Sequence, residues 1–458
     1  MSQAFCTLAL SEAMINNLTK LNYTSMTPVQ EASLPPILER ADVMAQAQTG
    51  SGKTAAFGIG LLHHLDPKEL KVQAAVMCPT RELSEQVANE LRRLARFTSN
   101  IKILSLVGGE AVYPQKVALE KGVHIIVGTP GRIMDTITKG HLDISEIKTL
   151  VLDEADRMLD MGFHDDIAAI IKLTPKYRQT LLFSATYEEE TKRLSKKFQL
   201  QPEFIHIDSK TDEVSITQNF YNVHEDDKVE LIDGLMAHNK LESCIIFCNK
   251  KLTCDEVAHE LHYRGYDVAA LHADLDQKER NEVLTMFSNK SLNILVATDV
   301  ASRGLDIKEL PAVFNYDICH QAEIYVHRIG RTGRMGQSGL AYTFVGPKEG
   351  KFVEAIAKYT EQKITLKTPP QLDSNKKFTR TSPNKTLKVL AGKKDKLRPG
   401  DFVGALSGEV GIKGDSIGNI TIVDRFSYIA IDKKQMDKIK LKDDRLKVKK
   451  KKYRYIKL

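Results

Sequence analysis

The sequence predicts an α/β protein with two parallel-sheet domains followed by a small α+β domain. Two stretches of the chain alternate short apolar runs with amphipathic helical patterns, which is typical of parallel sheets covered on both faces. A change from an acidic body to a basic tail marks off the last domain. The length of 458 residues is ordinary for two to four domains.

The strand-like runs are continuous, apolar and short. In the first stretch they lie at 74–78, 101–107, 124–129, 149–153 and 180–186, and in the second at 243–249, 267–273, 292–299 and 312–317. The clearest helical patterns lie at 82–97 and 251–265. Polar segments without periodicity, at 207–215 and 368–385, separate the parts. We therefore expect domains at 1–208, 213–367 and 385–458, with a linker at 368–384.

The charge is distributed unevenly along the chain. Residues 376–458 contain 24 Lys/Arg and 9 Asp/Glu, a net charge of +15. The preceding residues contain 42 Lys/Arg and 50 Asp/Glu, a net charge of −8. A whole segment of this charge favours binding to a nucleic acid, and a solvated charged surface is the alternative.

Other features of the composition concern the cellular compartment. No apolar run of 18 or more residues could cross a membrane. The first residues lack a basic stretch followed by an apolar one, so we expect a cytoplasmic protein, or a nuclear one in a eukaryote, with no membrane partner. The six cysteines form no CxxC pair and no common zinc spacing, which predicts reduced thiols, mostly buried.

The segment AQTGSGKT predicts a phosphate-binding loop. It follows an apolar strand-like run and precedes an apolar helical segment, which is the context that a P-loop requires. Glycines let backbone N–H groups face phosphate oxygens without a clash from Cβ. Lys53 would reach the β- and γ-phosphates, and the Thr54 hydroxyl would ligate Mg²⁺. The candidate loop residues are Ala47, Gln48, Thr49, Gly50, Ser51, Gly52, Lys53 and Thr54, with Ala47 where glycine is usual.

Two adjacent carboxylates supply the acid that such a site needs. The apolar run 149–153 delivers Asp153 and Glu154 to the carboxyl end of a strand, where α/β sheets bind ligands. We expect Asp153 to hold Mg²⁺, through water, and Glu154 to polarise the attacking water. For Asp156 the alternative of a helix N-cap stays open.

Seven motifs occur in a characteristic order. They are AQTGSGKT, PTREL (79–83), TPGR (129–132), DEAD (153–156), SAT (184–186), TDVASRGLD (298–306) and HRIGRTGR (327–334). Together they resemble the DEAD-box RNA helicases. The resemblance implies two RecA-like domains, ATP and Mg²⁺ as cofactors, and ATP-dependent local unwinding of RNA, with DNA not expected as a partner.

The resemblance also implies roles for single residues. The N-terminal segment is similar to the Q motif, in which Gln30 would bond the adenine and Tyr23 would stack on it, next to Asn22, a residue that tolerates positive φ. Arg331 and Arg334 would act as arginine fingers from the second domain, so hydrolysis would require closure of the two domains. Asp306 would touch the ribose, and Ser184 and Thr186 would couple the ATP site to RNA. The implied RNA-binding residues are Pro79, Thr80, Arg81, Gly109, Thr129, Pro130, Arg132, Thr298 and Arg303. For each glycine or proline among them, an ordinary turn is the alternative.

The segment 398–431 resembles the C-terminal domain of the DbpA-like bacterial DEAD-box helicases. This implies an RNA-recognition-motif fold, β-α-β-β-α-β, that binds a hairpin of large-subunit ribosomal RNA. Phe426 and Tyr428 partly match its aromatic consensus, whereas Lys388 stands where a stacking aromatic is usual. Tyr453 and Tyr455 alternate with basic residues, which predicts a last strand with one basic face; a floppy basic tail is the alternative.

The whole sequence therefore predicts an ATP-dependent RNA helicase. We expect it to bind 23S ribosomal RNA through its C-terminal domain and to unwind nearby short helices during assembly of the large (50S) subunit. Two alternatives stay open: a general cytoplasmic RNA helicase, and an ATP-regulated RNA clamp in RNA decay or cold stress.

Overall fold

The computed structural model describes most of the chain. The described residues are 3–47, 50–186, 189–207, 216–299, 310–333, 338–372, 378–440 and 442–458. They divide into two compact units, of which the first contains the described residues up to 207 and the second those from 216 onward. Within this part of the chain, no helix is both long and apolar enough to cross a membrane.

The first unit is built on a parallel sheet of seven strands in the order β3-β4-β2-β5-β6-β1-β7. Its strands are β1 (Val43–Gln46), β2 (Ala74–Met77), β3 (Ile103–Leu106), β4 (Ile125–Gly128), β5 (Thr149–Asp153), β6 (Gln179–Ser184) and β7 (Glu203–His206). Its helices are α1 (Glu12–Lys20), α2 (Pro28–Leu38), α3 (Lys53–His63), α4 (Arg81–Leu94), α5 (Val112–Glu120), α6 (Pro130–Thr138), α7 (Ala155–Asp160), α8 (His164–Leu173) and α9 (Glu189–Phe198).

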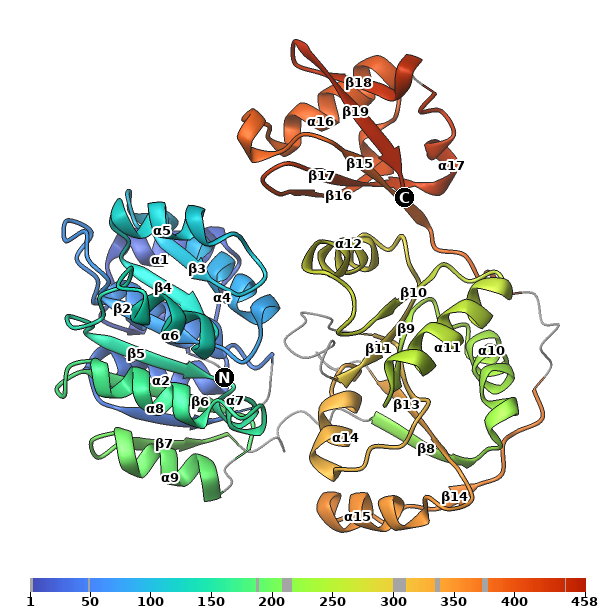
Figure 1. The fold of residues 1–458 in the computed structure, drawn as a ribbon, viewed down its shortest axis with the longest axis horizontal. Helices are drawn as coiled ribbons and strands as arrows, with labels where there is room; N and C mark the ends of the chain where they lie inside the picture. Colours follow the sequence, from blue (N-terminus) through green and yellow to red (C-terminus); the bar gives the residue numbers. More distant parts are fainter. Residues whose placement is uncertain are drawn as a thin grey trace. The chain divides into compact units, whose positions relative to one another are not determined.

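Helices cover both faces of this sheet, as Figure 1 shows. On β5, Val151 packs into a core with α1–α4, whereas Leu150 and Leu152 pack into a second core with α6–α9. Successive side chains of a strand point to opposite faces, so a strand between two cores is apolar at nearly every position. This is why the strands could be predicted from continuous apolar runs.

A second parallel sheet has the order β10-β11-β9-β12-β13-β8-β14. Its strands are β8 (Ile216–Asn222), β9 (Cys244–Cys248), β10 (Val268–Leu271), β11 (Ile294–Thr298), β12 (Ala312–Asn315), β13 (Gly339–Val345) and β14 (Leu366–Lys367). Its helices include α10 (Lys228–His238), α11 (Lys251–Tyr263), α12 (Gln277–Ser288), α14 (Ala322–Ile329) and α15 (Gly350–Thr360). The prediction of two parallel-sheet domains is thus confirmed. All six cysteines are free, and five of them are buried, as expected.

The last 75 residues form a small antiparallel sheet in the order β16-β17-β15-β19-β18. Its elements are β15 (Asn384–Val389), α16 (Pro399–Ala405), β16 (Ile417–Ile422), β17 (Ser427–Asp432), α17 (Lys433–Met436), β18 (Arg445–Val448) and β19 (Lys451–Lys457). Phe402 of α16 is fully buried against one face of the sheet. The strand β18 adds one strand to the predicted β-α-β-β-α-β pattern. The predicted last strand is confirmed, with Tyr455 buried in the core.

The segment predicted as a linker is bound to the second sheet domain over its described part. Arg380 donates from Nε and Nη2 to the carboxylate of Asp233, at 2.9 and 3.1 Å. Ser382 donates to Asp267 from both N and Oγ, at 2.8 and 2.7 Å. Phe378 packs against the apolar core of that domain. We call residues 378–382 the strap.

The small sheet also contacts helix α12. The Tyr428 hydroxyl donates to Glu282 at 3.1 Å, and the ammonium group of Lys388 pairs with the same carboxylate. Tyr428 is only 4% exposed as a result. The ring of Phe426 lies 5.4 Å from the Lys278 ammonium group. Tyr428 therefore serves a contact within the protein and is not an open platform for stacking.

Candidate functional site

The described residues among the predicted site residues of the first unit, except Tyr23 and Gln30, lie at or after the carboxyl end of a strand. In a parallel sheet these ends share one edge, which is where such folds bind ligands. The sheet order sorts the loops into two groups. The loops after β1, β5 and β6 carry the glycine loop, DEAD and SAT, whereas those after β2, β3 and β4 carry the three predicted RNA-binding loops.

The glycine loop leads directly into helix α3. Gly50 and Gly52 have φ values of +90° and +98°, a conformation that side-chain-bearing residues rarely adopt. Gly52 is the N-cap of α3, so the helix begins at Lys53 and directs its first N–H groups at the loop. The buried Lys53 ammonium group donates to the carbonyl oxygen of Ala47 at 3.0 Å. Gln48 and Thr49 lie outside the described residues.

Gln30 contacts the glycine loop, although 22 positions separate it from Gly52. Its side-chain amide donates to the carbonyl oxygen of Gly52 at 3.1 Å and accepts from the N–H of Thr27 at 2.9 Å. The half-buried Tyr23 donates from its hydroxyl to Glu90 at 2.7 Å, and burial raises the pKa of this phenol. Asn22 has a φ of +64°, as its residue type predicted.

Asp153 ends β5 and is 3% exposed. Burial raises the pKa of its carboxyl group to about 6, against the opposing effect of Lys53, and the charge of Glu154 adds to the rise. Its Oδ1 atom accepts no hydrogen bond from the part of the chain that the structure describes. A hard divalent cation would stabilise the ionised form of a buried carboxylate whose pKa is raised. The residues present therefore fit Mg²⁺.

Glu154 follows with a φ of +53° and is the N-cap of helix α7. Its Oε2 atom accepts a hydrogen bond from Arg157 Nη1 at 3.0 Å, and both side chains are at most 5% exposed. The alternative of an N-cap role for Asp156 is therefore wrong, because Glu154 is the N-cap and Asp156 is the second residue of α7.

Asp156 instead connects DEAD to SAT. Its Oδ2 atom accepts three hydrogen bonds: from the N–H of Ala185 at 3.0 Å, from the N–H of Thr186 at 2.9 Å and from the Thr186 hydroxyl at 3.1 Å. The Ser184 hydroxyl is fully buried and finds no partner among the described residues. Of the two predicted coupling residues, Thr186 is thus the one bonded to the DEAD segment. Sequence reasoning did not assign this role to Asp156, although its place in DEAD was a signal.

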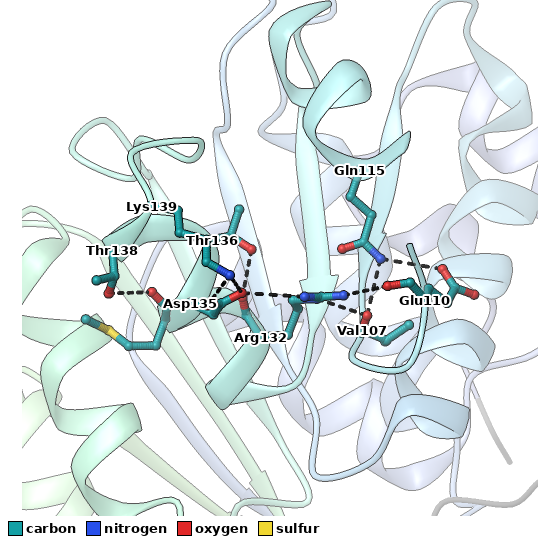
Figure 2. A network of polar contacts seen from close by, with 9 residues as sticks. Val107, Glu110, Gln115, Arg132, Asp135, Thr136, Thr138 and Lys139 are labelled. Atoms are coloured by element: carbon teal, nitrogen blue, oxygen red, sulfur yellow. Dashed lines mark hydrogen bonds and ion pairs between the residues drawn. The ribbon is translucent and has the colours of Figure 1, made fainter. Parts of the chain in front are cut away.

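Arg132 holds the loop after β3 in place (Figure 2). Its Nε atom donates to the carbonyl oxygen of Val107 at 3.1 Å, and Nη2 donates to that of Glu110 at 2.8 Å. Gly109 in this loop has a φ of +75°, so the turn requires glycine. A Cβ on Gly108 would lie 3.2 Å from the Arg81 guanidinium group. The structure therefore brings three predicted loops together, those of Arg81, Gly109 and Arg132.

The other residues predicted in these loops begin helices. Thr80 is the N-cap of α4, and its hydroxyl accepts from the N–H of Leu83 at 3.2 Å. Pro79 precedes it. Thr129 is the N-cap of α6, and Pro130 is its first residue. Both helices thus begin at the edge of the sheet where the strands end, which is a favourable place for phosphate groups.

In the second sheet domain, Arg328 ties three strand ends together, a role that sequence reasoning missed. This arginine is 2% exposed. It donates to both carboxylate oxygens of Asp299 at 2.6 and 2.7 Å, to Asn249 Oδ1 at 2.8 Å and to the carbonyl oxygen of Asp317 at 2.8 Å. The sequence held a signal for this role. Arg328 lies in HRIGR, and polar residues follow three apolar runs, at Asn249, Asp299 and Asp317.

Of the residues predicted in this domain, the structure describes two. Thr298 ends β11, and the buried Arg331 donates from its N–H to the carbonyl oxygen of Arg328 at 3.2 Å. Arg303, Asp306 and Arg334 lie outside the described residues.

The hairpin of β18 and β19 carries a basic face. Arg445 pairs with Arg454, and Lys447 pairs with Lys452, so these four exposed side chains share one face of the sheet. Arg454 and Lys457 also line a hollow of about 430 Å³. The prediction of a last strand with a basic face is confirmed.

Comparison with known proteins gives the same picture for each part of the chain. Residues 27–194 match the DEAD/DEAH box helicase family, residues 227–336 the helicase conserved C-terminal domain and residues 386–455 the DbpA RNA binding domain. The chain is 47% identical to the ATP-dependent RNA helicase DbpA of Escherichia coli (strain K12), over 93% of each chain.

Other relatives match a smaller share of the chain. The chain is 42% identical to the ATP-dependent RNA helicase CshA of Listeria monocytogenes over 81% of this chain and 71% of that protein. Its fold is similar to that of S. cerevisiae Dbp5 bound to RNA and ADP BeF3, with a TM-score of 0.72 and 30% identity over 80% of this chain and 96% of the other. On these grounds the chain belongs to the DEAD-box ATP-dependent RNA helicases and carries the RNA-binding C-terminal domain of the DbpA type.

Proposed function

We propose that this helicase binds 23S ribosomal RNA through its C-terminal domain and unwinds nearby short helices during assembly of the large ribosomal subunit in the cytoplasm. The observation that supports this most is the basic face of the C-terminal hairpin, in a segment that matches the DbpA RNA binding domain. Closely spaced cations attract the phosphates of a folded RNA. An exposed face of this kind remains accessible although Tyr428 is covered.

In the proposed ATP site, separate groups of residues would bind the phosphates, the adenine and Mg²⁺. The N–H groups of the glycine loop and the Lys53 ammonium group would hold the phosphates, while Tyr23 and Gln30 would bind the adenine. Thr54 and Asp153 would hold Mg²⁺, which neutralises charge on the phosphates when bound. The Oδ1 atom of Asp153, which accepts no hydrogen bond within the described part of the chain, supports this assignment. Glu154 would orient and polarise the attacking water.

The remaining roles belong to the same proposal. Arg331 and Arg334 would stabilise charge on the transferred phosphoryl group, and Asp306 would contact the ribose. Thr186, through Asp156, would couple this site to RNA together with Ser184. The predicted RNA-binding residues from Pro79 to Arg303 would hold the RNA backbone without reading its sequence, because helix N-termini and backbone N–H groups bind phosphates.

The anchoring role can be tested by charge reversal on the hairpin. The variant is Lys452→Glu/Arg454→Glu in the full chain, and the matched control is Lys351→Glu/Lys358→Glu on α15, which changes the charge equally. We would measure ATPase stimulation by 23S ribosomal RNA and by an unrelated RNA at two salt concentrations. We expect the hairpin variant to need at least tenfold more 23S RNA for half-maximal stimulation, with a flatter salt dependence.

The control and the second RNA decide between the alternatives. The α15 variant should behave as the wild type does with both RNAs. If the wild type responds equally to 23S and unrelated RNA, a general RNA helicase is the better description. If ATP turnover occurs without strand separation, the protein acts as an RNA clamp.

A further inference from the structure

The DEAD segment and the glycine loop bury three carboxylates and one ammonium group close to one another. Buried negative charge therefore exceeds the positive charge that Lys53 supplies. Asp153, Glu154 and Asp156 lie within four positions, and all are at least 93% buried. The buried Lys53 is one cation near them, next to Asp153. Buried carboxylates require compensation by cations or hydrogen bonds, because desolvation of an isolated charge is costly.

Each carboxylate has a different environment. Asp156 accepts three backbone N–H groups, those of Arg157, Ala185 and Thr186, and one hydroxyl, which satisfy it as an ion. One carboxylate oxygen of Asp153 accepts no hydrogen bond from the described residues, as a cation ligand would. Glu154 forms an ion pair with the guanidinium group of Arg157, which lies three residues later in α7.

The Glu154–Arg157 pair differs from an ordinary helix ion pair in two respects. The side chains are 4% and 5% exposed, so solvent does not screen the interaction as it does for a surface pair. In addition, Glu154 has φ and ψ values of +53° each, so a strained backbone aims its side chain. An unrestrained glutamate side chain has several rotamers, and fixing one of them costs conformational entropy. A bond to Arg157 restricts the carboxylate before substrate arrives.

We propose that Arg157 is a positioning residue for ATP hydrolysis, which holds the Glu154 carboxylate in the orientation that activates the attacking water. This inference rests on the proposed role of Glu154. The guanidinium group of Arg157 fits the task, because it is planar and donates N–H groups in a fixed geometry. Misplacement of a reacting group by about 1 Å can lower a rate by about 10²-fold.

The test uses the full chain with Arg157→Gln, Arg157→Lys, Glu154→Gln and the double variant Glu154→Gln/Arg157→Gln. The matched control is Arg178→Gln. Arg178 is a partly buried arginine beside the carboxylate of Asp42, at the opposite edge of the same sheet. The readouts are thermal unfolding, affinity for a fluorescent ADP derivative, and single-turnover and steady-state ATPase with RNA.

We expect Arg157→Gln to lower kcat at least tenfold, while KM for ATP and ADP-derivative affinity stay within twofold of the wild type. Arg157→Lys should restore part of the loss. In the Glu154→Gln background, Arg157→Gln should cause no further loss, since the carboxylate that it positions is gone. The Arg178→Gln control should keep the wild-type kcat.

Four outcomes would overturn the inference. They are a kcat of Arg157→Gln within twofold of the wild type, a parallel loss of nucleotide affinity, a further loss of the same size in the Glu154→Gln background, and a loss of equal size in the control. If Arg157→Gln does not fold, Arg157→Lys decides, and a wild-type kcat in that variant rejects the role. Normal hydrolysis by Glu154→Gln would instead reject the proposed role of Glu154 itself.

Discussion

The contact between Gly52 and Gln30 allows a sharp test of how the glycine loop is assembled. In Gly52→Ala, the new Cβ would lie 2.5 Å from Gln30 Nε2 and 2.9 Å from Thr27 Oγ1. The φ of +98° adds a backbone cost of about 1–2 kcal/mol for a residue with a side chain. Displacing the Gln30 amide also breaks its hydrogen bond to the loop, at about 1 kcal/mol.

The two costs affect different measurements. The backbone strain lowers the free energy of unfolding, whereas the displacement of Gln30 removes a group that the proposed adenine contact needs. A loss of about 1.4 kcal/mol in binding corresponds to a tenfold weaker affinity. We therefore expect Gly52→Ala to bind a fluorescent ADP derivative about tenfold more weakly, with a melting temperature a few degrees lower.

The control for this variant is Gly162→Ala. Gly162 has a φ of +81°, and a Cβ added to it would meet no heavy atom within 4 Å beyond its chain neighbours. This variant therefore carries the strain without the clash. It should lose a similar amount of stability and keep its nucleotide affinity. Wild-type affinity in Gly52→Ala, or an equal loss of affinity in Gly162→Ala, would refute the reasoning.

Three other side chains allow predictions of the same kind. Asp153→Asn should abolish ATP turnover but raise the melting temperature at pH 7 by a few degrees. Because the folded pKa is raised to about 6, the charged form destabilises the fold as pH rises from about 4, so the gain should vanish at pH 4. Arg132→Ala should raise the RNA concentration for half-maximal ATPase severalfold with KM for ATP unchanged, whereas Lys139→Ala, just after the same helix, should not. Arg380→Ala should lower the free energy of unfolding, measured with urea, by about 1–3 kcal/mol, because Asp233 stays buried with fewer partners; an unchanged midpoint would contradict this.

The sequence predicted the parallel strands well where both faces of the sheet are covered. The run 149–153 is apolar because Leu150 and Val151 pack into different cores, and periodicity then reports burial directly. Strands at the sheet margins, such as β7 and β14, are short and partly exposed, so they give no such signal. The sequence pattern also did not predict β18, which is recognised in the structure by its pairing with β19.

The candidate site was predictable where a motif and the end of a strand coincide. Lys53 and Asp153 could be placed at one edge of the sheet from this rule alone. The bonds from Asp156 to Thr186 and from Arg132 to the loop after β3 could not, because each joins a residue near the start of a helix to a loop residue 30 or 25 positions away. The covering of Tyr428 by α12 depends on domain packing, which local pattern does not encode.

The strap has a consequence for how the chain can vary in length. Segments rich in Pro, Ser and Lys commonly tolerate insertions, because they connect domains without specific contacts. Here Arg380 and Ser382 are matched to Asp233 and Asp267 at fixed spacing. One residue added between Arg380 and Ser382 would shift one of the two out of reach of its carboxylate. The strap belongs to a segment whose composition is that of a flexible linker. An insertion or deletion in the strap should nevertheless destabilise the protein, as it would in the interior of a folded domain.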